Sequence, residues 1–279
     1  MSCIGWRAFW RICFPIPPSN PSECPERSCA RGEVEWRCTV SREEAFSDIY
    51  SRKAWGDGHS LSGPGSDPGI SAPYVAYVER VIGEEGLRSV LDLGHGDWQM
   101  WPTDAFSRVT YTGLEVVPQV SELVREQHGR PGRNFLEEDV VSANWPTTDL
   151  VLCKDVLMHL PNADVTRILE KMAQVPRSII CHDVLPTQRS LAGAASQVRA
   201  QLAPTFRWNE LLKRRRFWRR FMVTNEEITA GGYRPLDLNK KPWNLSKFGL
   251  RPIEVFDMPS NNPWPGVVKR IWSLEGLGR

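Results

Sequence analysis

Residues 90–97 read Val-Leu-Asp-Leu-Gly-His-Gly-Asp, and this stretch decides the fold. Branched apolar residues surround the acid Asp92, and the glycines Gly94 and Gly96 flank His95. An apolar run of this kind is typical of a strand buried on both faces of a parallel sheet, and the glycines predict a tight turn at its carboxyl end. Because glycine lacks a Cβ, the backbone can approach a ligand closely there. Nucleotide-like ligands bind at this edge of doubly wound sheets.

Three further segments along the chain have the same apolar character and lie next to acids. Residues 110–114 end at Glu115, residues 135–140 contain three successive acids, and residues 149–153 lead into an apolar helical run. Glu115 follows the glycine turn by about 20 residues, the spacing at which a carboxylate holds a ribose diol. An acid at a strand-to-helix turn often only caps the helix, but four acids in register are hard to explain as caps.

The glycine turn and the order of these segments resemble the class I S-adenosylmethionine-dependent methyltransferases, whose first motif is acid-x-Gly-x-Gly. The resemblance implies an α/β fold, with a Rossmann-like doubly wound sheet of about seven strands and helices on both faces. It also implies S-adenosylmethionine as the cofactor. In that family the third strand ends with an acid that faces the adenine amino group, here Asp139. The fourth strand ends beside the methionine portion, here residues 153–155, and His95 stands where Cys, Ser or Gly is more usual.

Two other segments extend the resemblance to a bacterial and phage subgroup of these methyltransferases. Ser-Gly-Pro-Gly-Ser occupies residues 62–66, and Arg-Pro-Leu-Asp-Leu occupies residues 234–238, where Tyr233 replaces a tryptophan of the subgroup. The resemblance covers about residues 45–175 and 224–257. In the family, the upstream segment folds over the cofactor. The motif and the resemblance together give the expected cofactor-binding residues: Asp92, Gly94, His95, Gly96, Asp97, Glu115, Asp139, Val140, Cys153, Gly65 and Ser66.

Length and composition indicate one large domain with an extension. The 279 residues can bury one α/β core. No apolar run reaches about 18 residues, so we expect no membrane span and a cytoplasmic protein. Residues 1–40 hold five of the seven cysteines at irregular spacings, and we expect a poorly ordered extension without a metal site. The methyltransferase domain is expected over 41–279, with a helical part before the sheet at 41–88, the cofactor half at 89–183, a helical basic insertion at 186–223, and sheet closure with the substrate side at 224–274.

Positive charge is concentrated in one segment, residues 207–220. This segment holds seven basic residues and one acid and carries a charge of +6, so the rest of a chain with a net charge of +2 sums to −4. Such a segment suits weak contact with a membrane surface or another polyanion, and the alternative is a solvated helix face. Because the remainder of the chain is acidic, we expect no stable nucleic-acid complex.

Methyl transfer from a sulfonium is an in-line displacement with a neutral leaving group, so the enzyme mainly has to align the reactants. A general base is needed only for a hydroxyl or a protonated amine. The candidates at the sheet edge are Asp155, His159, His182 and Asp183. His182 and Asp183 are preferred, because they follow a buried strand at 178–181 and strand ends face the ligand crevice. His159 lies in an apolar run, where a packing role is the simpler explanation.

Two residues are candidates for binding the acceptor. Trp55 could line the acceptor channel or stack on adenine, and Arg234 could clamp an acceptor carboxylate or phosphate, although a surface salt bridge would explain the arginine equally well. The sequence therefore predicts an S-adenosylmethionine-dependent methyltransferase that acts on a small or medium polar acceptor, such as a glycan or metabolite. The alternatives are a nucleic-acid methyltransferase and a non-catalytic domain that binds S-adenosylmethionine. A nicotinamide-dependent dehydrogenase is disfavoured by the missing third glycine.

Overall fold

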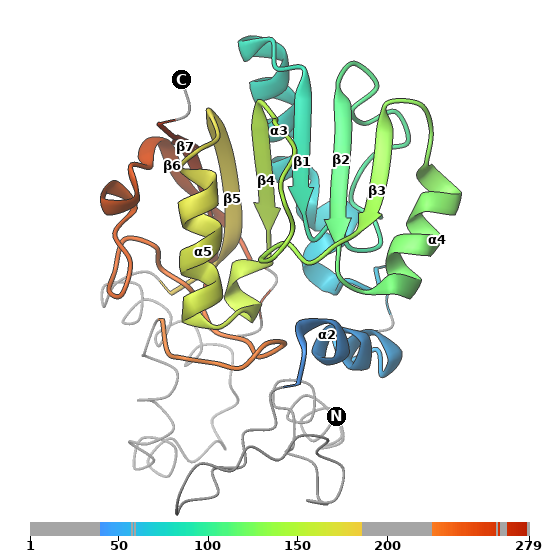
Figure 1. Cartoon of the computed structure of the whole chain (residues 1–279), viewed down its shortest axis with the longest axis horizontal. Coiled ribbons are helices and arrows are strands. Elements are labelled where there is room, and N and C mark those ends of the chain that lie inside the picture. Colours follow the sequence, from blue (N-terminus) through green and yellow to red (C-terminus); the bar gives the residue numbers. More distant parts are fainter. Residues whose placement is uncertain are drawn as a thin grey trace, which may run out of the picture.

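Seven strands form one mixed sheet, and their order across it is β3-β2-β1-β4-β5-β7-β6 (Figure 1). The computed structural model describes residues 40–185, 225–260 and 267–277, apart from residues 57 and 59, together with Asn262. The strands are β1 (Ser89–Leu93), β2 (Thr110–Glu115), β3 (Arg133–Glu137), β4 (Leu150–Lys154), β5 (Arg177–Val184), β6 (Arg251–Pro259) and β7 (Val268–Glu275).

Strand β1 lies at the point where the strand order reverses. It pairs in parallel with β2 on one side and with β4 on the other, so that Leu91 lies opposite both Thr112 and Val151. The pairs β2–β3 and β4–β5 are also parallel, whereas β7 is antiparallel to β5 and to β6. In doubly wound sheets such a reversal leaves a crevice outside the carboxyl ends of the two strands, and ligands bind in it.

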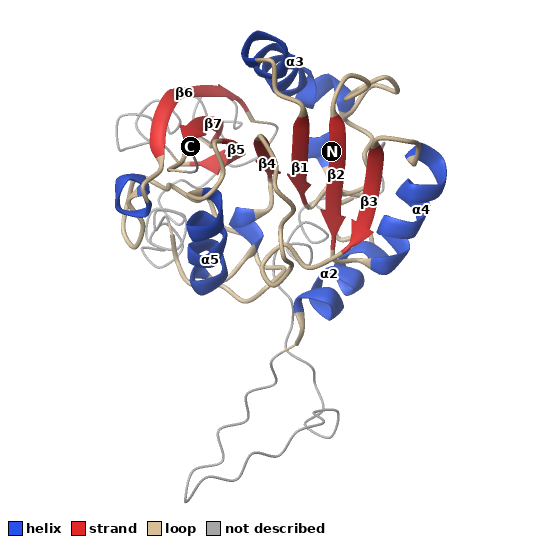
Figure 2. Cartoon of the chain, turned by 45° about the horizontal axis from the view of Figure 1, so that its top comes forward, coloured by secondary structure: helices blue, strands red, loops and turns tan. Residues whose placement is uncertain are grey.

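Helices cover both faces of the sheet and also its carboxyl edge. They are α2 (Arg42–Ser51), α3 (Pro68–Glu85), α4 (Pro118–His128) and α5 (Asn162–Met172). Helix α2 lies beneath the arrowheads of β1 and β2, across their carboxyl ends (Figures 1 and 2). In the described part of the chain, three short 3-10 helices occupy connections: η2 (Pro64–Ser66), η3 (Leu157–His159) and η4 (Leu245–Phe248).

The ends of α2 and α3 follow recognisable sequence signals. Ser41 caps α2 through reciprocal hydrogen bonds with Glu44, which together form a capping box. The side chain of Asp67 caps α3 by accepting a hydrogen bond from the Gly69 amide, and Gly86 ends the helix in the left-handed conformation. These caps fix the positions at which the chain enters α2 and at which it enters and leaves α3.

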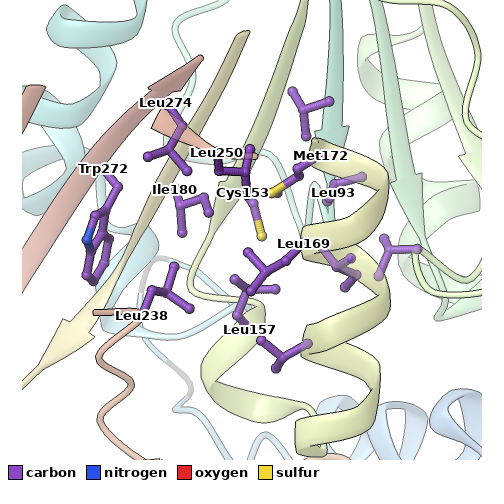
Figure 3. Packing of buried hydrophobic residues seen from close by; sticks show 14 of the residues in the cluster. Leu93, Cys153, Leu157, Leu169, Met172, Ile180, Leu238, Leu250, Trp272 and Leu274 are labelled. Carbon is purple, nitrogen blue, oxygen red and sulfur yellow. The ribbon is translucent and has the colours of Figure 1, made fainter. Parts of the chain in front are cut away.

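Two apolar clusters lie on opposite faces of the sheet. One packs α5 against the sheet, where Leu169 and Met172 meet Cys153 and Ile180 (Figure 3). The other packs α3 and α4 against the opposite face. All five residues of β4 and all eight of β5 are buried. Close packing on both faces makes the strands that carry the site a rigid base for it.

The predicted α/β fold with a doubly wound sheet is confirmed, and several element boundaries differ from the sequence expectation. β3 ends at Glu137, so Asp139 lies in the loop beyond the strand rather than at its end. β5 continues to Val184, so His182 and Asp183 belong to the strand itself. The apolar run after β4 forms only the short turn η3 instead of a longer helix.

Three expectations from the sequence fall on segments that are not described. Residues 1–39 of the expected extension at 1–40 lie outside the described residues, and so does the whole of the expected insertion at 186–223, which contains the basic segment 207–220. Within the part of the chain that the structure describes, no helix is long and apolar enough to cross a membrane. In the same part, no three His, Cys, Asp or Glu residues form a group that could hold a metal ion.

Candidate functional site

A pocket of about 250 Å³ opens at the carboxyl ends of the central strands. Its walls come from the glycine turn after β1, the ends of β2 and β4, the loop after β3, and η3. Helix α2 contributes Arg42, Phe46 and Tyr50, and the loop before α3 contributes residues 62–66. The pocket therefore lies where the reversal of strand order predicts a ligand crevice.

The two glycines of the turn after β1 are required by the backbone and by their neighbours. Gly94 and Gly96 have φ values of 68° and 58°, the left-handed region that favours glycine. A Cβ on Gly94 would lie 2.7 Å from Cγ2 of Val156, and one on Gly96 would overlap with Oγ of Ser62. A larger residue at either position would therefore collide with atoms of the protein itself, whether or not a ligand is bound.

Residues 60–66, which we call the upstream loop, are tied directly to the glycine turn. The Asp97 carboxylate accepts hydrogen bonds from Ser60 Oγ at 3.0 Å and from the Leu61 amide at 2.5 Å. Ser62 Oγ in turn accepts from the Asp97 amide at 2.9 Å and lies 2.8 Å from Tyr50 Oη. The expected cofactor residue Asp97 therefore anchors the loop, and the same loop brings Gly65 and Ser66 to the pocket.

Two buried acids stand behind the glycine turn. Glu115 accepts hydrogen bonds from the amides of Gly96, at 3.2 Å, and Val117, at 3.0 Å, and burial raises its pKa to about 7. Asp92 accepts from Tyr111 Oη at 2.7 Å, and burial raises its pKa to about 6. Both acids line the pocket. Glu115 joins the ends of β1 and β2, the place predicted for a carboxylate that holds a ribose diol.

His95 fills the space between the two glycines with a neutral ring. Its Nδ1 lies 2.7 Å from the Gly96 carbonyl oxygen, and because a carbonyl can only accept, Nδ1 carries the proton. The ring packs edge-on against Phe135, and burial lowers its pKa to about 4. A Cβ on Gly113 would approach His95 Cδ2 to 2.8 Å, so Gly113 makes room for the ring.

Asp139 is already engaged by a guanidinium. Arg42 Nε lies 3.0 Å from Oδ1 and Arg42 Nη2 lies 2.5 Å from Oδ2. The Val141 amide and Ser142 Oγ also donate to the carboxylate. Burial opposes the ionised form of Asp139, but these hydrogen bonds together with the hydrogen bonds and charge of Arg42 lower its pKa. Asp139 lines the pocket as expected, but in this arrangement a partner such as an adenine amino group would share it with Arg42.

The two remaining cofactor candidates differ in whether they line the pocket. Val140 lines the pocket. Cys153 does not, because its side chain is buried in the apolar cluster with α5 (Figure 3), where desolvation raises the pKa of the thiol. The expectation that Cys153 contacts the cofactor is therefore corrected, since alternate residues of a strand face opposite sides of the sheet.

His182 is also directed away from the pocket. Its Nε2 donates to the Leu236 carbonyl oxygen at 2.8 Å, and its ring lies against Trp272 with centroids 4.7 Å apart. The residue is fully buried, and burial lowers its pKa to about 4. This corrects the prediction that His182 is the preferred base. Its neighbour Asp183 does line the pocket.

His159 occupies the position at the pocket that His182 was expected to have. Its ring centroid lies 5.1 Å from that of Trp55 and 5.9 Å from that of Tyr233. Nδ1 lies 2.7 Å from the Gly232 carbonyl oxygen, so Nδ1 carries the proton and Nε2 is the basic nitrogen of the neutral ring. Burial lowers the pKa of His159, against the opposing effect of the Asp155 and Asp183 charges.

A network of four charged groups lies beside His159. Asp155 accepts from Lys154 Nζ at 2.7 Å and from Lys269 Nζ at 2.6 Å. Lys269 Nζ also lies 3.4 Å from Asp183 Oδ1. The two ammonium groups hold the pKa of Asp155 well below its usual range, despite its burial. Asp155 has a φ of 57°, which turns the chain sharply after β4 and places the carboxylate between the lysines.

Arg234 does not reach the pocket. Nη1 donates to the Leu160 carbonyl oxygen at 2.8 Å, and Nη2 donates to Asn162 Oδ1 at 2.9 Å. Its side chain also faces the ring of Trp243, with Cζ 5.9 Å from the centroid. The expected acceptor clamp is therefore corrected: Arg234 is buried and holds the connection between η3 and α5.

The sequence reading missed the lysines and the residues of α2 that line the pocket. Lys154 ends a buried strand, where lysine is rare, and that anomaly could have drawn attention to it. Lys269 and Arg42 carry no comparable signal, because the one lies in an ordinary strand sequence and the other in the polar first turn of a helix.

Comparison with known proteins supports the fold and the chemical class. Residues 91–178 match the model of a family described as a methyltransferase domain. No curated protein matches the sequence. One similar structure is magnesium protoporphyrin IX methyltransferase from Synechocystis PCC 6803 with bound SAH, at 14% identity and a TM-score of 0.52, covering 85% of this chain and 100% of that one.

A second similar structure is 1,6-didemethyltoxoflavin-N1-methyltransferase from Burkholderia thailandensis, bound to 1,6-didemethyltoxoflavin and S-adenosylhomocysteine. It has 14% identity and a TM-score of 0.51, covering 90% of this chain and 96% of the other. At these identities the structures establish the fold. The family match covers residues 91–178 and indicates a methyltransferase domain in that part of the chain.

Proposed function

We propose that this chain transfers a methyl group from S-adenosylmethionine to a small or medium polar acceptor in the pocket. The observation that carries the proposal is the hydrogen bond between the Gly96 amide and the Glu115 carboxylate. It joins the glycine turn and the buried acid at the reversal of strand order. The upstream loop and residues 234–238 support membership of the bacterial and phage subgroup, within one methyltransferase domain that we place at residues 41–279.

The donor set of the pocket fits the proposed cofactor. Glu115 receives only backbone donors among the described residues, so its carboxylate keeps lone pairs for a ribose diol. Asp139 and Val140 lie in the loop that would border the adenine, and Gly65 and Ser66 lie on the side of the upstream loop. When bound, S-adenosylmethionine supplies an activated methyl group whose leaving group is a neutral thioether.

In the proposed mechanism the residues of this chain align the reactants and remove one proton. Trp55 and Tyr233 flank His159 and line the pocket, where they would orient a polar acceptor and limit access of water. For a hydroxyl acceptor, the basic Nε2 of His159 takes the proton as the oxygen forms its bond to the methyl carbon. The carboxylate of Asp155 and the Lys269 ammonium keep the charge beside His159 fixed.

The proposal is tested by a search for the product. Purified protein is incubated with isotopically labelled S-adenosylmethionine and a fractionated metabolite extract, and products that gain one labelled methyl group are identified by mass spectrometry. We expect S-adenosylhomocysteine to form in step with one methylated small molecule, and both to fall in Glu115→Ala when S-adenosylmethionine is below saturation. Binding of S-adenosylmethionine without any product in extracts or with nucleic acid would favour the alternative of a non-catalytic binding domain. Methylated nucleotides would favour the nucleic-acid methyltransferase.

A further inference from the structure

The pocket has a cationic corner to which the proposed methyl transfer assigns no contact with a ligand. Among the described residues that line the pocket, the cationic side chains are Arg42, Lys154 and Lys269. Arg42 is held by two ion pairs, with Asp139 and with Asp164 at 2.9 Å. The side chains of the two lysines are only 3% exposed, and a buried ammonium is costly unless oxygen partners surround it.

Each of the two lysine ammonium groups has one N–H donor beyond those directed at its described oxygen partners. Lys154 Nζ donates to the Gly65 carbonyl oxygen at 2.8 Å and to Asp155 Oδ2 at 2.7 Å. Lys269 Nζ donates to Asp155 Oδ1 at 2.6 Å and lies 3.4 Å from Asp183 Oδ1. An ammonium carries three N–H groups, so each lysine keeps one donor beyond these contacts with described residues.

The carboxylates of the same network are well supplied with donors. Asp183 receives hydrogen bonds from Tyr233 Oη, Ser260 Oγ and Asn262 Nδ2, at 2.9, 2.9 and 2.7 Å, and has Lys269 nearby. Asp155 lies between two ammonium groups. A ligand that completes this network therefore has to contribute an oxygen acceptor, and an anionic oxygen is best matched to ammonium donors.

The upstream loop closes this corner. A Cβ on Gly65 would lie 2.9 Å from Asp155 Oδ2 and 3.4 Å from Lys269 Nζ, so the loop backbone passes directly beside the network. The Gly65 carbonyl oxygen is itself a partner of Lys154. The corner is thus a built part of the pocket, in which two strands and the upstream loop fix both ammonium groups.

We propose that Lys154 and Lys269 form a carboxylate-binding subsite of the pocket. The proposal rests on the proposed function, because the carboxylate belongs either to the amino-acid part of the methyl donor or to an acidic acceptor. Both sources present the same chemistry to the lysines. Arg234, which the sequence suggested for such a contact, is buried elsewhere, and the structure moves this role to the two lysines.

Calorimetry with paired ligands distinguishes the two sources. S-adenosylhomocysteine carries the carboxylate and 5′-methylthioadenosine has the same nucleoside without it. Benzoate and benzamide, added to the S-adenosylhomocysteine complex, form the matching pair for the acceptor side. The variants are Lys154→Met and Lys269→Met, and the control is Lys171→Met, whose ammonium donates to two backbone carbonyls away from the pocket.

If the donor supplies the carboxylate, the lysine variants lose at least about tenfold in affinity for S-adenosylhomocysteine and keep their affinity for 5′-methylthioadenosine. If an acidic acceptor supplies it, benzoate binding is lost and S-adenosylhomocysteine binding is kept. Either result supports the subsite, and Lys171→Met should show neither. The proposal is overturned if all four ligands bind the variants as they bind the wild type, or if both nucleosides weaken equally.

A measurement on the unaltered protein covers the case in which the variants do not fold. In protein with ¹⁵N-labelled lysine side chains, the buried Nζ resonances should shift on addition of S-adenosylhomocysteine or benzoate, but not with 5′-methylthioadenosine or benzamide. Equal responses to both members of each pair would overturn the subsite. Failure of the wild type to bind either nucleoside would instead refute the proposed function, so the two failures are distinguishable.

Discussion

Arg42 and Asp139 form a two-point ion pair that fastens α2 to the loop after β3. The distances are 3.0 Å from Nε to Oδ1 and 2.5 Å from Nη2 to Oδ2. Arg42 also reaches Asp164 at the start of α5. One arginine therefore connects the helix that covers the pocket with two segments on the sheet side. The pair also occupies the carboxylate that we expect to face the adenine.

The first prediction separates these two roles of Asp139. Asp139→Ala should lower the affinity for S-adenosylhomocysteine by at least about tenfold, because it removes the adenine partner, and it should also lower the melting temperature. Arg42→Met should lower the melting temperature but keep the affinity within about threefold, because the carboxylate stays. Calorimetry and thermal unfolding measure both quantities. Equal losses of affinity in the two variants would show that the ion pair matters to binding, rather than an adenine contact.

The second prediction concerns the pH dependence of stability. Glu115 has a folded-state pKa of about 7, above the value near 4.5 of an unperturbed glutamate. The folded state therefore binds the proton more tightly than the unfolded state, and the free energy of unfolding should fall as pH rises from about 4.5 through 7. Relative to the wild type without ligand, Glu115→Gln should gain stability between pH 5 and pH 8 in denaturant titrations. A constant difference across that range would contradict the burial of an ionised Glu115.

The affinity for S-adenosylhomocysteine should change with pH in the opposite direction, and through the same residue. The ionised carboxylate accepts hydrogen bonds from a ribose diol better than the neutral acid, so the affinity of the wild type for S-adenosylhomocysteine should rise as pH increases through about 7. In Glu115→Gln the affinity should be lower at pH 8 and lack this step. Calorimetric titrations at pH 6 and pH 8 make the comparison. A step of the same size in both proteins would place the titrating group elsewhere.

The third prediction tests why Gly96 is a glycine. Gly96→Ala should lower stability and displace the upstream loop, since its Cβ overlaps with Ser62 Oγ. Gly132→Ala is the matched control, because Gly132 also has a positive φ but nothing lies within 4 Å of an added Cβ. The control should show only the backbone strain, of about 1 kcal/mol. Equal losses of stability would mean that the contact with Ser62 is not responsible.

The fourth prediction assigns the base to His159. With an acceptor hydroxyl, His159→Gln should lower kcat by about a hundredfold or more and leave the affinity for S-adenosylhomocysteine unchanged. Because burial lowers the pKa of His159 below 6.5, wild-type kcat should be level at neutral pH and fall only in more acidic solution. His182→Asn, the control, should reduce stability but keep the pH profile. An unchanged kcat in His159→Gln would remove the base from the mechanism.

The sequence was sufficient for the sheet and for bringing most of the expected cofactor residues to one pocket, because apolar strand patterns and the acids at their ends are local signals. It could not decide which way neighbouring side chains point. His182 and Asp183 are adjacent in β5, yet only Asp183 lines the pocket. Because β5 is buried over its full length, its residues show no alternation of buried and exposed positions that would indicate which side chains face the pocket.

Long-range partners account for the other differences. From the sequence, Arg234 suited an acceptor clamp or a surface salt bridge, but its partners, Leu160 and Asn162, come from the segment between η3 and α5. Lys269 joins the charged network only because β7 inserts next to β5, which places it beside Asp183 in the antiparallel register. Neither relationship is local, so neither could be inferred from residue spacing.

We infer that the glycine turn and Glu115 bind the nucleoside of S-adenosylmethionine. Isothermal titration of the wild type and of Glu115→Ala with S-adenosylhomocysteine, and of the wild type with NAD⁺, tests it most directly. We expect a single site for S-adenosylhomocysteine, an affinity at least about tenfold weaker in Glu115→Ala, and no binding of NAD⁺. Unchanged affinity in the variant, or NAD⁺ binding that S-adenosylhomocysteine displaces, would contradict it.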